Sequence, residues 1–176
     1  MITYINFVFT VFIIICGLDS SQQFRLKFTK VECDTPNKSE VIFETCKVKA
    51  VSRNLQYISL NVTFRELPLY DINGTVAFFK RANGYKPFLY SFELNCETVK
   101  RLNPVTKLVW QWFQDNSNIG RLCPFETNFL IPRLENVYLE KSMLQLPVPG
   151  GDYACFTTWL LNNKTQLSVK VYGTIS

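Results

Sequence analysis

Short runs in which apolar and polar residues alternate make up most of the chain beyond its first twenty residues. The clearest run is residues 57–64, where Ile58, Leu60, Val62 and Phe64 share one side and polar residues share the other. An alternation of period two is typical of a strand with one buried face. Similar runs occupy residues 24–33, 40–51, 74–81, 86–95, 152–161 and 165–175.

The segment 104–114 has a helical period instead. Its apolar residues recur at the spacing of one helix face: Val105, Leu108, Val109, Trp112 and Phe113. Asn103 is a suitable N-cap, and Pro104 suits the first helical position. The period of segment 134–146 is ambiguous, and we expect a strand followed by an irregular stretch. Together these patterns predict an all-β fold, an antiparallel β-sandwich of about seven or eight strands with one short amphipathic helix near residues 104–114.

The first twenty residues have a different composition. The run from Phe7 to Cys16 is apolar and is followed by small and polar residues. It is too short for the roughly 20 residues that cross a bilayer, and it is typical of a secretory signal peptide. Cleavage after Gly17 or near Ser20 fits equally, and the alternative is a retained signal anchor. We therefore expect a signal peptide over residues 1–20, a single β-sandwich domain over residues 21–176, and a secreted, soluble protein with at most peripheral membrane contact.

The chain has six cysteines, and removal of the signal peptide would take Cys16. The five that remain should form disulfides in an oxidising compartment, with one thiol left over. Fifteen arrangements satisfy that condition. Sequence separation favours pairing of Cys33 with Cys46 and of Cys96 with Cys123. Cys155 would then remain free as a buried, inert thiol.

Four Asn-x-Ser/Thr sequons predict N-glycosylation, which requires exposure to solvent. They begin at Asn37, Asn61, Asn73 and Asn163. Asn61 falls on the polar side of the run 57–64, where a glycan is sterically tolerated.

The chain of 176 residues contains no histidine. Its absence excludes Ser-His-Asp and Cys-His catalysis and every metal site that needs a histidine ligand. The sequence also lacks a glycine-rich phosphate loop, a Gly-x-Ser-x-Gly motif and a cluster of metal ligands. We expect a protein that is not an enzyme and holds no cofactor or metal. The alternative is a hydrolase in which two carboxylates converge in a cleft.

The formal net charge is +5, and basic residues gather in two places: Lys80, Arg81 and Lys86, and Lys100 and Arg101. They are too dispersed for a nucleic-acid partner. Such patches can attract anionic lipid headgroups or glycans, or they can simply solvate the tip of a hairpin.

Aromatic residues make up 15% of the chain. They either fill an ordinary core or line an apolar cavity between the sheets. The candidate cavity-lining residues are Phe78, Phe88, Tyr90, Phe92, Trp112, Phe113, Phe156 and Trp159. The function we expect is a secreted glycoprotein that binds or presents a hydrophobic small molecule or lipid. The alternative is a protein-interaction module with a filled core, whose surface contacts a receptor or another extracellular protein.

One stretch is distinctive: residues 79–90 read Phe-Lys-Arg-Ala-Asn-Gly-Tyr-Lys-Pro-Phe-Leu-Tyr. The motifs that follow it are Cys96, Asn103-Pro104, Asn118-Ile119, Cys123-Pro124, Gly150-Gly151-Asp152-Tyr153 and Val169-Lys170-Val171-Tyr172. With these motifs the chain resembles, from about residue 24 to residue 176, a large insect family of small secreted proteins. That family is catalogued as a domain of unknown function and is similar to the CheB chemosensory proteins of insects. More distantly, it resembles lipid-recognition β-sandwiches such as the ganglioside activator and mite-allergen proteins.

The resemblance implies an immunoglobulin-like β-cup that holds a lipid between its sheets, with a role in chemosensory or other extracellular signalling. It also implies a residue other than cysteine at position 155. An intermolecular disulfide is therefore an alternative fate for Cys155.

Overall fold

A computed structural model of the chain describes residues 24–89, 91–143 and 148–176. The predicted signal peptide, Cys16 and Tyr90 lie outside the described residues. In chain order the strands are β1 (Leu26–Asp34), β2 (Val41–Ala50), β3 (Gln56–Phe64), β4 (Ile72–Ala82), β5 (Gly84–Pro87), β6 (Phe92–Asn95), β7 (Phe129–Glu135), β8 (Gly151–Leu161) and β9 (Thr165–Ile175). The helices are the 3₁₀ helix η1 (Thr98–Arg101), α2 (Pro104–Asn116) and α3 (Asn136–Met143).

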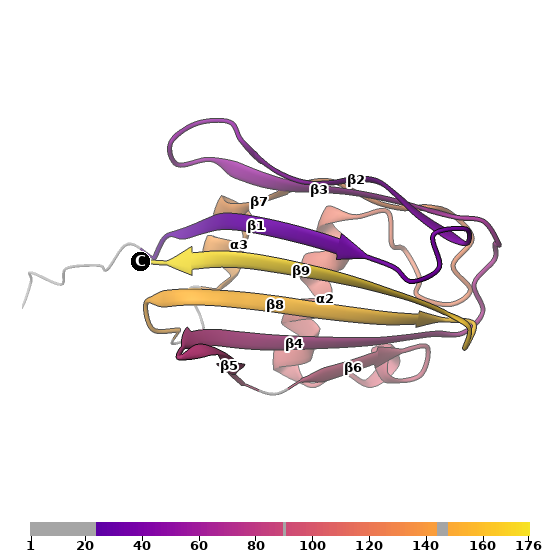
Figure 1. Cartoon of the computed structure of the whole chain (residues 1–176). Helices are drawn as coiled ribbons and strands as arrows, with labels where there is room; N and C mark the ends of the chain where they lie inside the picture. The colour runs from indigo at the N-terminus through magenta and orange to yellow at the C-terminus, as the bar shows by residue number, and fades with distance from the viewer. Residues whose placement is uncertain (1–23, 90, 144–147) are drawn as a thin grey trace, which may run out of the picture.

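The strands of the described chain form two antiparallel sheets (Figure 1). The larger sheet has the order β1-β9-β8-β4-β5, and β6 also pairs with β4. The smaller sheet has the order β2-β3-β7. Inward residues of the two sheets, such as Val62 of β3 and Val76 of β4, belong to one buried core. The predicted all-β sandwich is therefore confirmed.

Strand alternation decides which residues enter this core. In β3, Ile58, Leu60 and Val62 are buried, as the run 57–64 predicted. In β9, Leu167 and Val169 are buried in the same way. Each apolar side chain removed from water contributes about 1.5–3 kcal/mol, so a slip of one residue in either register would be strongly unfavourable.

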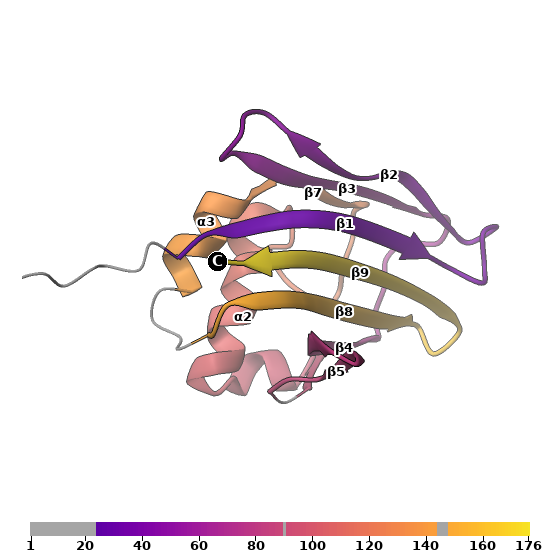
Figure 2. The same cartoon turned by 60° about the vertical axis from the view of Figure 1, so that its left-hand side comes forward.

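Helix α2 covers the part of the larger sheet that the narrower sheet leaves open, as Figure 2 shows. The Asn103 side chain accepts a hydrogen bond from the Thr106 N–H at 2.9 Å, which confirms the predicted N-cap. On its inner face, Trp112 meets Phe78 of β4 edge-to-face, with ring centroids 6.5 Å apart. The predicted helix near residues 104–114 is therefore confirmed. Among the described residues, no helix is long and apolar enough to span a membrane.

Two local predictions were wrong. The segment after β7 is not an irregular stretch, because α3 begins at Asn136 and runs to Met143. The side-chain amide of Asn136 is buried and bonds to backbone groups of distant segments, an interaction that local periodicity does not reveal. The run 86–95 is not one strand either. It is divided between β5 and β6, and Leu89 between them has a left-handed φ of 65°.

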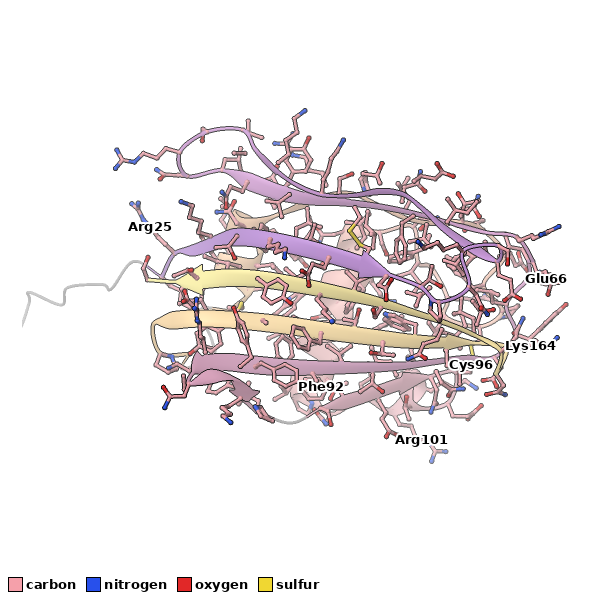
Figure 3. All side chains as sticks on the ribbon, viewed as in Figure 1. Arg25, Glu66, Phe92, Cys96, Arg101 and Lys164 are labelled. Atoms are coloured by element: carbon pink, nitrogen blue, oxygen red, sulfur yellow. A yellow bond between two sulfur atoms is a disulfide. The ribbon has the colours of Figure 1, made fainter. Side chains whose placement is uncertain are left out.

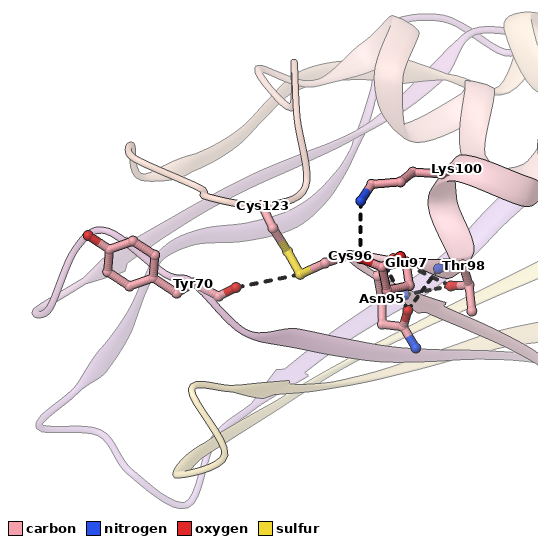
Figure 4. Close-up of polar contacts among 7 residues, drawn as sticks. All are labelled: Tyr70, Asn95, Cys96, Glu97, Thr98, Lys100 and Cys123. Atoms are coloured by element: carbon pink, nitrogen blue, oxygen red, sulfur yellow. Dashed lines mark hydrogen bonds and ion pairs between the residues drawn. A yellow bond between two sulfur atoms is a disulfide. The ribbon is translucent and has the colours of Figure 1, made fainter.

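The predicted disulfides are confirmed in the described chain. Cys33–Cys46 joins β1 to β2 and so ties the two sheets together along one edge. Cys96–Cys123 joins the end of β6 to the segment between α2 and β7. Figure 4 shows this second bridge beside the Tyr70 carbonyl oxygen, which lies 3.5 Å from Cys96 Sγ. Close by, the Asn95 side chain accepts hydrogen bonds from the N–H groups of Glu97 and Thr98 and fixes the turn into η1.

Candidate ligand cavity

An apolar cavity of about 240 Å³ lies between the two sheets and α2. Its walls come from both sheets and from both α-helices, and they are almost entirely aliphatic and aromatic side chains. Representative aliphatic wall residues are Leu60 on β3, Ile131 on β7 and Val169 on β9. No acidic or basic side chain is among the described lining residues.

Most of the aromatic residues that the sequence singled out do line this cavity. They are Phe78, Phe88, Phe92, Trp112, Phe113 and Trp159. Phe92 stands near the lower edge of the molecule in Figure 3, where β6 meets the larger sheet. The aromatic rings come from β4, β6, β8, α2 and the segment after β5, so residues far apart in the chain converge on one space.

Phe156 was wrongly expected to line the cavity. It lies on β8 three residues before Trp159, and strand alternation places residues three apart on opposite faces. Its ring instead joins an outer aromatic cluster on the solvent-facing side of the larger sheet, made by Phe79, Tyr85, Phe156 and Tyr172. Lys170 lies over the Phe156 ring, with Nζ 5.5 Å from its centroid.

Gly74 shapes one wall of the cavity. It faces inward on β4 directly opposite Trp159 of β8. A Cβ atom built at Gly74 would overlap the six-membered ring of Trp159. The glycine therefore lets the indole lie flat on the sheet instead of projecting into the cavity, a role that the sequence analysis missed.

Few polar groups face or border the cavity. The Thr157 hydroxyl is buried and donates a hydrogen bond to the Val169 carbonyl at 3.2 Å, so it is already satisfied. Burial raises the pKa of the Cys155 thiol to about 12, which keeps it protonated at neutral pH. The Trp112 Nε1–H is buried and has no hydrogen-bond acceptor in the described structure. The described wall of the cavity therefore suits an apolar group.

Cys155 forms no disulfide in the described structure, as the sequence predicted. Its place in the cavity wall was not predicted. The aliphatic wall residues were missed as well. Alternation correctly turns those on the strands inward, but that signal is the same for a residue that fills a core and one that borders a space.

The cavity reaches the surface near the segment after β5 and the first turn of α2. Leu89 and Val105 both line it, and their exposed fractions are 53% and 36%. Phe88 and Tyr153 lie beside this opening, with ring centroids 5.2 Å apart. The Tyr153 hydroxyl donates a hydrogen bond to the Pro149 carbonyl at 2.6 Å. We call the region around these residues the mouth of the cavity.

The sequon asparagines lie at or near the surface. Asn61 is on the outward face of β3, and Asn163 is exposed in the turn between β8 and β9. Asn73 and Asn163 both donate from Nδ2 to the Asp71 carboxylate, at 3.0 and 2.5 Å. Asn37 is half-buried before β2. Asn73 also borders a polar hollow of about 410 Å³ on the outer face, beside the exposed Thr75 and Glu93 side chains.

The chain was compared with known protein families. A family described as a protein of unknown function (DUF1091) matches residues 74–155, a little under half of the chain. The matched segment runs from β4 into β8 and carries most of the aromatic cavity wall. No curated protein matches the chain. The chain is therefore similar to this family over its central segment, and the match brings no activity with it.

Proposed function

We propose that this protein binds a small lipophilic molecule, non-covalently, in the cavity between its sheets. The observation that carries the proposal is the apolar space of about 240 Å³. Empty apolar volume lowers stability by about 24 cal/mol per Å³, so this cavity costs roughly 6 kcal/mol relative to a filled core. Net stabilities of domains are only about 5–15 kcal/mol. A ligand that fills the cavity would therefore recover much of this lost stability.

The volume limits the ligand. An apolar cavity of about 150 Å³ binds benzene, which has six carbon atoms. At the same volume per atom, a cavity of about 240 Å³ holds about ten non-hydrogen atoms. The ligand we propose is therefore a single short chain or a compact lipophile, rather than a lipid with two long acyl chains.

The proposed setting is extracellular. The two disulfides of the described chain are typical of proteins from oxidising compartments. The predicted signal peptide and the surface sequons support a secreted glycoprotein. With the resemblance to CheB-like and ganglioside-activator-like proteins, these features support a role in carrying or presenting a lipophile in chemosensory or other extracellular signalling. The absence of histidine supports binding rather than catalysis.

A series of straight-chain alcohols tests the proposal. The protein, secreted from cultured cells with its disulfides intact, is titrated with hexanol, octanol, decanol, dodecanol and tetradecanol by calorimetry. Each buried methylene contributes about 0.8 kcal/mol, so affinity should rise about fourfold per carbon while the cavity fills. We expect the rise to stop near eight to ten carbons.

If no alcohol binds, the proposal is wrong. That result would favour the alternative, a protein-interaction module, for which the outer aromatic cluster is an available surface. A continued rise through tetradecanol would contradict the size limit, because the chain would then extend beyond the cavity described here.

A further inference from the structure

Lys80 holds its ammonium group beside the mouth of the cavity. It lies near the end of β4, on the same inward-facing row as Phe78, and it is paired with Tyr153 of β8. Its Nζ atom lies 5.4 Å from the centroid of the Tyr153 ring, which lines the cavity. A positive charge therefore stands next to an otherwise apolar wall.

The local backbone keeps the Lys80 side chain in this place. Gly151 has a φ of +145°, a conformation that favours glycine. A Cβ atom there would lie 3.1 Å from Lys80 Cε. The lysine stem thus packs closely over the bare backbone of Gly151, with Nζ held near Tyr153.

The Lys80 ammonium lies over the Tyr153 ring but forms no ion pair within the described residues. The neighbouring Arg81 faces the other side of the sheet and forms an ion pair with Asp152 at 3.6 Å, whereas neither Lys80 nor Lys86 forms an ion pair within the described residues. Lys86 lies opposite Lys80 in the β4–β5 pairing. The mouth of the cavity is therefore electropositive.

The first turn of helix α2 brings no negative charge to the mouth. This turn carries Val105 at the mouth and contains no acidic residue. The backbone dipoles of the helix place partial positive charge at this end.

We infer that the ligand of the cavity is an anionic amphiphile, a short alkyl chain that ends in a carboxylate. The chain would occupy the apolar cavity, and the carboxylate would pair with the Lys80 ammonium at the mouth. This inference rests on the proposed function and adds the chemical class of the head group. Lys80 is a half-buried residue, so its charge is screened less by solvent than those of the exposed lysines elsewhere on the surface, and a carboxylate placed there binds more tightly than at an exposed site.

Decanoate and decanol form the matched ligand pair, because they share a chain length and differ in head group. Both are titrated at pH 7.5, where the acid is ionised, into the wild-type protein and into Lys80→Met. Methionine keeps most of the apolar stem and removes the charge. Lys47→Met, on an exposed position of β2 in the other sheet, is the control variant.

We expect wild-type protein to bind decanoate about three- to tenfold more tightly than decanol. Lys80→Met should abolish this preference by weakening decanoate binding, and continued binding of decanol shows that the variant is folded. Lys47→Met should keep the preference. If Lys80→Met binds decanoate as tightly as wild type while decanol also binds, the head-group inference is wrong and the cavity proposal stands. If neither compound binds wild-type protein, both fail together.

Discussion

At the scale of single residues, the absence of a side chain at Gly74 makes room for the Trp159 ring in the cavity wall. The Trp159 indole occupies the space that a Cβ atom would need, so the ring can lie against β4. A larger residue would move the ring into the cavity or push β4 and β8 apart. A substitution at Gly74 should thus change both the cavity volume and the stability of the protein.

We predict that Gly74→Ala destabilises the protein and narrows the cavity. Overpacking of a filled site costs about 1–3 kcal/mol, and we expect a loss of that size in the free energy of unfolding in urea. Decanol affinity should fall as well, because the displaced ring occupies part of the cavity. The substitution keeps the Asn73 sequon, so glycosylation does not confound the measurement.

Gly120→Ala is the matched control. A Cβ atom at Gly120 meets nothing within 4 Å, and the residue is exposed. Its substitution should change the free energy of unfolding by less than about 0.5 kcal/mol. Equal losses in the two variants would mean that the contact with Trp159 is not what requires a glycine at position 74.

At the scale of elements, one buried amide connects three segments. Asn136 begins α3 and is only 3% exposed. Its Oδ1 accepts a hydrogen bond from the Gln56 N–H at 2.8 Å, and its Nδ2 donates to the carbonyls of Leu26 at 2.9 Å and Asn54 at 3.1 Å. Helix α3 is thereby tied to the start of β1 and to the turn between β2 and β3.

We predict that Asn136→Ala lowers the free energy of unfolding by about 2–4 kcal/mol, because it leaves backbone groups in a buried site without partners. Urea denaturation checks the value. The control is Asn128→Ala, since Asn128 is exposed and its side chain accepts a single hydrogen bond, from the Phe64 N–H. That variant should lose about 1 kcal/mol or less. Comparable losses would contradict a linking role for Asn136.

Elements that are determined by residues close together in the chain could be predicted from the sequence. Strand β3 follows from alternation over residues 57–64, and α2 follows from its spacing and its Asn103 cap. Helix α3 could not be predicted, because the bonds that hold Asn136 reach residues 80 to 110 positions away. The misplacement of Phe156 was avoidable, because it cannot share a face of β8 with Trp159.

At the scale of the whole molecule, the cavity results from the unequal widths of the two sheets. The narrow sheet β2-β3-β7 cannot cover the inner face of the wide one, and α2 closes the remainder. The space left between these layers depends on how far apart they settle. The alternation of inward residues is the same whether the layers meet or stand apart, and for this reason the sequence predicts the lining but not the cavity.

Substitutions of Cys155 should change the cavity volume in both directions. Its side chain lines the cavity and makes no disulfide in the described structure, so substitution leaves Cys33–Cys46 and Cys96–Cys123 intact. Cys155→Leu should fill part of the space, raise the free energy of unfolding of the ligand-free protein by about 1 kcal/mol, and shorten the preferred alcohol. Cys155→Ala should enlarge the space, lower that free energy by about 1 kcal/mol, and lengthen the preferred alcohol.

The opposite shifts separate a ligand inside the cavity from one on the surface. An alcohol bound to the outer aromatic cluster would be indifferent to residue 155, because Cys155 points inward from β8 and Phe156 points outward. Calorimetric titration of both variants with the same alcohols measures the preferred chain length directly. If that length stays constant while stability changes as expected, the alcohols bind elsewhere. If it shifts by one or two carbons in opposite directions, the volume between the sheets determines ligand size.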